Sequence, residues 1–560
     1  MQQFFKLASG LSSPAILIVV LWGMVLACVA IGPIDYPMQP TPAVLALVAA
    51  GISLFVAAYF AGAGCFRAWF KRRENLAIPS TSTLNNVVVT TSLFGVAGIG
   101  LMTLDRLVLS GVGNSGYTEL LRCAPGLVDF IEVKRTPLLY VGYLTFSFGF
   151  ASLAMFLLKG EEIKGWVAIL AQLSILSPAG YAILYSGRMP ILFVIVLIVS
   201  AMLVRIAQGR RPLPNGHHLF LKMAAVLLLF VVYSSGMWAS RQNFCVQMSG
   251  LIFELQQRMH ERDLEPAAAL GPGQAKLKQQ QAEFSAQPDP NVKSNEPNAD
   301  QQKEQAAGVT STPSDIRQTP AAVPQPPRPD KISASDLSKM IAEKAGQQAP
   351  VSVEVRGFQT TMQESWHVRP RPYVVAAIDS GRLSPNAAMS LLSTYFYLTH
   401  GIRVMDMVWR ERAQFSPHWG FYEIGILSPI FRVFFPQNQQ LADMERQLKS
   451  TGIYGFFPTV WAAAFIDFGI IGAVIYVAIW GFAAGWSAFG AKHSSFATPP
   501  LLLAFILASI FLSPVQGPLG IANSALVLFS IILTGLAIDL PSFGASSVQA
   551  ARELKLRASG

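Results

Sequence analysis

Long runs of uncharged apolar residues constrain this chain more than any other feature of its sequence. Runs such as WVAILAQLSILSPAGYAIL and ILFVIVLIVSAMLV carry no charged side chain. Several runs reach about 18 to 22 residues, which is long enough for a helix to cross the hydrocarbon core of a bilayer. Because the apolar residues follow one another without alternation, and lipid admits only helices or closed barrels, they predict an all-α polytopic membrane protein.

The apolar runs predict about ten transmembrane helices and one large external loop late in the chain. Of the 560 residues, 52% are hydrophobic and only 13% are charged. No repeat relates the two halves of the sequence in span spacing or in charge pattern. The spans are expected near residues 14–32, 43–62, 86–108, 138–158, 166–186, 190–207, 219–238, 468–488, 499–516 and 520–539.

Lysines and arginines in the short loops predict the orientation. Residues 67–75, 159–165 and 205–222 are rich in these cations, whereas residues 33–41 contain none. Cytoplasmic loops carry the excess of Lys and Arg, so the three basic loops and both termini are expected in the cytoplasm. The tight turn YSGRMPILF then faces outward, together with its Arg188.

The external loop is expected to contain a disordered insertion and a folded part with amphipathic helices. Residues 265–350 are rich in Gln, Pro and Ala and cannot bury enough apolar area to fold. The sequence divides into a membrane part (1–238), the start of the loop (239–264), the insertion (265–350), a folded external part (351–467), a second membrane part (468–540) and a cytoplasmic tail (541–560).

Signatures of soluble enzymes and of metal or cofactor sites are missing from the sequence. It contains no phosphate-binding loop, dinucleotide fingerprint, zinc-ligand spacing or nucleophile elbow in a suitable context. We therefore expect no metal, no cofactor and no nucleic-acid partner. Cys123 and Cys245 both fall in predicted external loops, and whether they pair is left open.

Arginines on the outer side carry the functional signal. The arginines on that side of the predicted topology are Arg106, Arg188, Arg241, Arg403, Arg410 and Arg412. They either snorkel to the membrane interface or form a cluster for phosphate, because guanidinium offers a fixed fork of donors. The turn at Arg188 favours the second interpretation, since so short a turn has no spare length.

Aromatic side chains lie between these cations in the external loop. They either pack the loop onto the membrane surface or stack on the apolar faces of sugars, and the sequence leaves both interpretations open. The set comprises Trp366, Tyr395, Tyr397, Trp409, Trp419 and Tyr422.

Three motifs resemble the Wzy family of oligosaccharide repeat-unit polymerases, also called O-antigen polymerases. They are IYGFFPTVWAAAFIDFGIIGAVIY at residues 453–476, the stretch YFYLTHGI before it, and the turn SGRMPIL. The arrangement of spans with one large late external loop is also similar. The resemblance covers most of the membrane part but not the insertion. Gly452 stands where the family commonly has an Asn before the tyrosine.

The resemblance implies a polymerase of O-antigen, capsule or exopolysaccharide. It would transfer glycan from undecaprenyl diphosphate to the terminal sugar of another lipid-linked unit. It implies a metal-independent membrane glycosyltransferase of the bacterial inner membrane, with the large loop in the periplasm. Its partners would be lipid-linked oligosaccharides and membrane lipid, and a chain-length-regulating co-polymerase is left open.

Such a reaction needs cations for the leaving diphosphate and a base for the attacking hydroxyl. Arg188, Arg241 and Arg403 would neutralise the diphosphate. His400 is the preferred base because imidazole titrates near working pH, with His418 second and Glu423 third. Asp467 either orients a base or a sugar hydroxyl, or caps a helix. Further residues expected to bind substrate are Arg106, Arg410, Trp419, Tyr422 and Tyr454.

Two other functions are compatible with the sequence. An O-antigen ligase would transfer finished glycan to lipid A core by the same chemistry. A secondary transporter or lipid flippase could use the same cations, although transporters usually carry ionisable groups at mid-membrane and show repeated halves.

Overall fold

The fold was obtained as a computed structural model. It describes residues 10–36, 39–71, 80–110, 120, 131–132, 136–185, 187, 189–214, 221, short pieces within 224–255, 332–333, 368–425, 427–428, 431, 435, 439–451, 457–520 and 523–559. Arg188, Arg241 and Tyr454 lie outside the described residues, as do Trp366 and the cysteines whose pairing is open.

The described chain is helical, with eight segments long and apolar enough to cross a membrane. Several begin with proline at the first helical position, where a missing N–H costs nothing. The membrane helices are α2 (Pro14–Ile31), α3 (Pro42–Lys71), α4 (Thr81–Leu104) with its continuation η1 (Asp105–Leu109), α6 (Pro137–Phe146) with α7 (Phe148–Lys159), α8 (Gly165–Leu173) with α9 (Leu176–Leu184), α10 (Met189–Ala207), α20 (Val460–His493), the shorter α21 (Thr498–Leu512) and α22 (Ser524–Ser559). The predicted all-α membrane fold is confirmed.

The structure changes the bounds of the spans predicted at 468–488 and 520–539, and it does not test a third. The span expected at 219–238 lies mostly outside the described residues. The one expected at 468–488 begins at Val460, because Thr459 caps α20 by accepting a hydrogen bond from the N–H of Ala462. Asp467 therefore lies inside the helix, and its predicted capping role is wrong. The last span continues without a break into the tail, to Ser559.

Glycines bring α20 and α3 into backbone contact. A Cβ atom added to Gly485 would collide with the carbonyl oxygen of Tyr59, and one added to Gly481 would lie 2.5 Å from that of Phe55. On α3, Gly62 approaches the carbonyl of Phe482 in the same way. Small residues at such contacts are typical of helix pairs in membranes, where packing rather than water release drives association. These two helices thus form one stiff unit.

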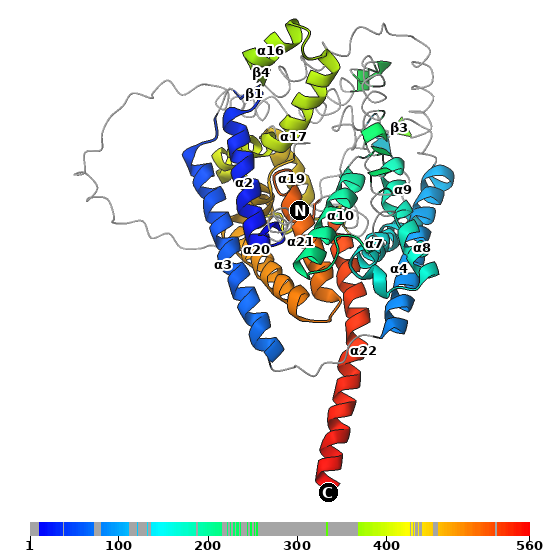
Figure 1. The fold of residues 1–560 in the computed structure, drawn as a ribbon. Helices are drawn as coiled ribbons and strands as arrows, with labels where there is room; N and C mark the ends of the chain where they lie inside the picture. Colours follow the sequence, from blue (N-terminus) through cyan, green and yellow to red (C-terminus); the bar gives the residue numbers. More distant parts are fainter. Residues whose placement is uncertain are drawn as a thin grey trace, which may run out of the picture.

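One end of the bundle carries the elements of the predicted external loop (Figure 1). They are the short α16 (Pro372–Asp379) and the long α17 (Pro385–Arg410), with α19 (Gln439–Ser450) further along the chain. Strand β4 (Arg369–Pro370) pairs antiparallel with β1 (Ile34–Asp35), which follows α2. A small core of Ile34, Tyr36, Val368, Val374, Leu392 and Phe396 joins these elements. The loop is therefore tied to the first span.

The insertion predicted from the sequence contributes one described element. Ile332–Ser333 forms strand β3, which pairs in parallel with β2 (Ile131–Glu132). These two residues are an exception to the predicted disorder of the segment. The rest of residues 265–350 lies outside the described residues.

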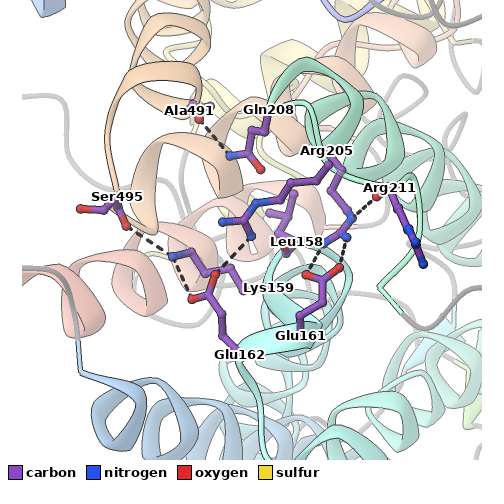
Figure 2. Close-up of polar contacts among 10 residues, drawn as sticks. Leu158, Lys159, Glu161, Glu162, Arg205, Gln208, Arg211, Ala491 and Ser495 are labelled. Carbon is purple, nitrogen blue, oxygen red and sulfur yellow. Dashed lines mark hydrogen bonds and ion pairs between the residues drawn. The ribbon is translucent and has the colours of Figure 1, made fainter.

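Arg205 closes the opposite side of the bundle, where the loops predicted to be cytoplasmic meet (Figure 2). Its side chain is fully buried. It donates to the carbonyl oxygens of Arg211 at 2.7 Å and Leu158 at 2.9 Å, and it pairs with the carboxylate of Glu161. A buried guanidinium is tolerated only when paired and hydrogen-bonded, so this clamp joins α10 to the loop after α7.

Candidate active site

A kink in α20 organises the candidate site. Gly469 has φ 64° and ψ −170°, which interrupts the helix. This backbone region is essentially restricted to glycine. The loop that follows α17, residues 411–425, which we call the return loop, passes over the kink, and a Cβ on Gly469 would lie 3.8 Å from Pro417 of this loop. The return loop therefore packs against α20 at the kink.

Asp467 holds the return loop in place from inside α20. Its carboxylate is buried and accepts hydrogen bonds from the backbone N–H groups of Tyr422 at 3.0 Å and Glu423 at 2.6 Å. Its backbone carbonyl accepts from the N–H of Trp419 at 2.8 Å. Trp419 itself has φ 55°, a left-handed conformation that these bonds sustain. Asp467 thus fixes the backbone of the return loop at Tyr422 and Glu423.

Glu423 is the buried carboxyl that the loop presents. Its side chain is 1% exposed, and Oε1 accepts from the hydroxyl of Tyr476 at 2.9 Å and from the N–H of Leu519 at 3.1 Å. Oε2 has no hydrogen-bond partner among the described residues. Gly517 leaves the space for this carboxylate, since a Cβ there would collide with Oε1.

The surroundings of Glu423 suit proton transfer. Burial, with a smaller contribution from the charge of Asp467, raises the pKa of Glu423 to about 7, despite the hydrogen bonds from Leu519 and Tyr476. A general base is most effective when its pKa lies near the working pH. Burial and the two adjacent carboxylates also raise the pKa of Tyr422. The Glu423 carboxyl is therefore poised to exchange a proton.

His418 lies in the same loop and binds to α19. Its Nε2 is 3.0 Å from Oε1 of Gln447, which as an amide oxygen accepts the hydrogen bond. The side chain is buried, and this burial lowers the pKa of His418. His418 therefore connects the return loop to α19 through its hydrogen bond with Gln447.

His400, the preferred base from the sequence, has different surroundings. It is 3% exposed, its ring stacks on Phe396 at 4.7 Å, and its Nδ1 lies 2.9 Å from the carbonyl oxygen of Phe396. Burial lowers the pKa of His400 to about 4. A group with so low a pKa is a weak proton acceptor near neutral pH, whereas the pKa of Glu423 is about 7.

The arginines of α17 belong to a polar stripe facing the segment between α2 and α3. Asp406 accepts from the hydroxyl of Thr41 at 2.6 Å and pairs with Arg410 at 2.8 Å. Although burial raises it, these partners bring the pKa of Asp406 below its ordinary value. Burial lowers the pKa of Arg403, which lies near Tyr36. The charge of Arg410 is thus partly neutralised by Asp406, whereas the neighbour of Arg403 is the side chain of Tyr36.

Arg106 lies in a separate cluster of tyrosines. Its guanidinium lies 4.0 Å above the ring of Tyr185, whose hydroxyl accepts from Tyr143 at 2.6 Å. Asn523 donates to the hydroxyl of Tyr181 in the same cluster, at 2.8 Å. The connection between α21 and α22 contains Asn523 and also Leu519, the partner of Glu423. This connection therefore reaches both clusters.

The structure thus brings together His418, Tyr422, Glu423 and Asp467, and it places Arg403 and Arg410 on the preceding helix. Trp419 is 68% exposed beside them. Sequence reasoning missed Tyr476, Gln447, Gly517 and the N–H of Leu519. Tyr476 and the kink glycine lie within the quoted motif, but nothing in the motif shows which carboxyl they contact.

Comparison of the chain with protein-family models, with curated proteins and with solved structures found no match.

Proposed function

We propose that this protein polymerises lipid-linked oligosaccharide repeat units by transferring glycan from a polyprenyl diphosphate to a sugar hydroxyl of a second lipid-linked unit. The observation that carries the proposal is the Glu423 carboxyl, which is buried, has a pKa of about 7 and keeps one oxygen without a partner in the described chain. The motifs around Asp467 and the outer arginines support the same reaction.

The proposed step is a displacement at the anomeric carbon of the donor sugar. The acceptor hydroxyl gives its proton to Oε2 of Glu423, and its oxygen forms a bond to the anomeric carbon. The bond from that carbon to the diphosphate oxygen breaks, and its electron pair leaves with the diphosphate. General-base catalysis of this kind contributes about 10²- to 10⁴-fold in rate.

Two residues would position the base without touching the sugar. Tyr476 donates to Oε1 of Glu423, which leaves Oε2 as the oxygen that would accept the proton. The carboxylate of Asp467 accepts a hydrogen bond from the backbone N–H of Glu423 and would thereby fix the position of Glu423 over the kink. Preorganised contacts of this type lower the cost of reaching the transition state.

Arginines would neutralise the leaving diphosphate. Arg403 is the described candidate, and Arg188 and Arg241 remain predictions from the sequence. A guanidinium matches phosphate oxygens through two donors at once, and lysine lacks this geometry.

The decisive test is complementation of a deletion strain, with the glycan ladder as readout. Cells without the protein should keep single repeat units and lose the ladder, and Glu423→Gln should fail to restore it at matched protein levels. Glu411→Gln makes the same chemical change at an exposed position of the same loop. It is the matched control and should restore the ladder.

The same experiment separates the other functions. A ligase would leave lipid-linked polymer in the mutant and lose only its attachment to lipid A core. A transporter would leave repeat units on the cytoplasmic side. Either result would overturn the polymerase proposal.

A further inference from the structure

The connection between α21 and α22, residues 513–523, passes directly against the carboxyl of Glu423. A Cβ atom added to Gly517 of this connection would collide with both carboxylate oxygens. Two residues later, the backbone N–H of Leu519 donates to Oε1 at 3.1 Å. On this side the carboxyl is therefore in contact with backbone, and the conformation of the connection determines the direction of the donor.

One peptide group of the connection links Glu423 to the first residue of α22. The N–H of Leu519 and the carbonyl of Pro518 belong to the same planar peptide unit and point in opposite directions. The carbonyl oxygen of Pro518 accepts a hydrogen bond from the hydroxyl of Ser524 at 2.7 Å. Because the unit is rigid, a bond that holds its oxygen also fixes the direction of its N–H. Ser524 and Glu423 thus bind opposite edges of one peptide group.

The proline leaves this peptide group one main freedom. Its ring fixes the φ angle of Pro518, so the group can still turn by rotation about the ψ angle of the same residue. The hydrogen bond from Ser524 to the carbonyl oxygen opposes that rotation. The serine side chain is fully buried, so water does not compete for the bond. The donor to Glu423 is therefore preorganised.

The hydrogen bond of Ser524 differs from a helix cap. A capping serine accepts a bond from a backbone N–H in the first turn of its own helix. The hydroxyl of Ser524 instead donates to a carbonyl six residues earlier, outside α22. Stabilisation of the start of α22 therefore does not account for this bond, whereas orientation of the peptide group does.

The beginning of the connection is anchored independently. The indole N–H of Trp22 donates to the hydroxyl of Ser513 at 2.9 Å, and the carbonyl oxygen of Ser513 accepts from the N–H of Val460 at 3.0 Å. Ser513 lies six residues before Leu519, whereas the carbonyl held by Ser524 is part of the donor's own peptide group. Ser524 therefore controls the donor more directly.

We propose that Ser524 is a positioning residue for Glu423 and acts through the peptide group between Pro518 and Leu519. It directs the N–H of Leu519 to Oε1 and so favours the carboxylate, whose other oxygen has no partner among the described residues. The value of this contact for polymerisation rests on the proposed function, whereas the hydrogen bonds themselves do not.

The effect of the contact on titration has a definite sign. Burial raises the pKa of Glu423 to about 7, and the hydrogen bond from Leu519 is the largest effect that opposes it. The described titratable groups that face Glu423 are Asp467 and Tyr476 of α20 and the adjacent Tyr422. None of them changes when the serine is replaced. Loss of the Leu519 bond should therefore raise the pKa of Glu423 by about one pH unit.

The test is an infrared titration of the purified full-length protein. It follows the C=O band of the protonated carboxyl that disappears in Glu423→Gln. Ser524→Ala should raise the pH midpoint of this band by about one unit. Ser524→Cys, which has a similar size and a weaker donor, should raise it by less. An unchanged midpoint in both variants would overturn the proposal.

The matched control lies on the same helix. Ser530 is also fully buried, and its hydroxyl donates to the backbone carbonyl of Ser147, outside α22, at 2.9 Å. Ser530→Ala therefore removes the same kind of bond at a place that does not contact the connection, and it should leave the midpoint unchanged. An equal shift in Ser530→Ala would show a general loss of structure and overturn the proposal.

The pH dependence of the rate gives a second readout. With the midpoint raised by about one unit, Ser524→Ala should polymerise about fivefold more slowly than the wild type near pH 7, because fewer molecules carry the carboxylate. Near pH 9 both proteins should be ionised and have similar rates. Slowing by the same factor at both pH values would indicate a structural defect and contradict a positioning role.

The infrared titration does not depend on polymerisation. If Glu423→Gln restores the ladder but Ser524→Ala shifts the midpoint, Ser524 positions the carboxyl and the polymerase proposal fails. If Glu423→Gln loses the ladder and the midpoint stays in place, the polymerase proposal stands and the role of Ser524 is overturned.

Discussion

At the scale of single residues, the proposed reaction depends on the protonation of one carboxyl. The pKa of Glu423 is raised to about 7 because the group is buried. Its carboxylate, which is the form that accepts a proton, is therefore the major form only above that pH. The polymerisation rate of the purified enzyme should rise as the pH increases through about 7 and level off above it. A rate that is flat between about pH 6 and 8 would contradict this role.

The raised pKa of Glu423 also predicts that the stability of the fold decreases as the pH rises, whereas the rate increases. A carboxyl with a raised folded-state pKa holds its proton more tightly when folded, so the fold loses stability as the pH rises from 4.5, the ordinary value, to about 7. The loss amounts to about 3 kcal/mol at most. Glu423→Gln is neutral at every pH, so its melting temperature should exceed that of the wild type near pH 8 and match it near pH 4. An inactive variant that is also less stable near pH 8 would indicate a structural role only.

His400 provides the contrasting residue prediction. Its ring packs on Phe396, and its pKa of about 4 makes it a poor base. His400→Gln should therefore keep polymerisation within about tenfold of the wild type, less than the roughly 10²-fold or more expected for a lost general base. Complete loss of the ladder at normal protein levels would restore His400 as the base.

At the scale of elements, the apolar runs predicted most of the helices, because a bilayer demands internally hydrogen-bonded segments of sufficient length. The sequence predicts a span that begins only at residue 468, because Asp467 is typical of a helix boundary, and so it places the first turns of α20 in the external loop. Nothing in the sequence indicates that Asp467 is buried under a loop some 45 residues earlier and accepts hydrogen bonds from its backbone N–H groups. Glu423 ranked third for the same reason: burial raises its pKa, and burial depends on tertiary contacts with Gly517 and Tyr476.

The kink in α20 gives the element-scale prediction. Alanine at position 469 would occupy a backbone region that costs a non-glycine residue about 1–3 kcal/mol. Gly469→Ala should therefore straighten α20, displace the return loop and abolish the ladder. Gly64→Ala is the control, because a Cβ there meets nothing within 4 Å, and it should keep activity. Normal polymerisation by Gly469→Ala would separate the kink from function.

At the scale of the whole molecule, the predicted orientation can be checked at the two ends of the bundle. Arg382 lies between α16 and α17, and Ser495 lies at the opposite side, between α20 and α21. Both positions are exposed. In a cysteine-free protein, Arg382→Cys in intact cells should react with an impermeant thiol reagent, and Ser495→Cys should react only after lysis. Labelling of position 495 alone would invert the topology and place the site on the wrong side.

The glycine contacts between α3 and α20 have a mechanical consequence. Backbone packed on backbone leaves no side chain that can change rotamer, so the spacing of these two helices is fixed. An apolar pocket of about 300 Å³ lies between these two helices and α17, which lines it with Met405 and Trp409. The return loop continues directly from the end of α17, so the helix that lines this pocket also carries the loop that contains Glu423.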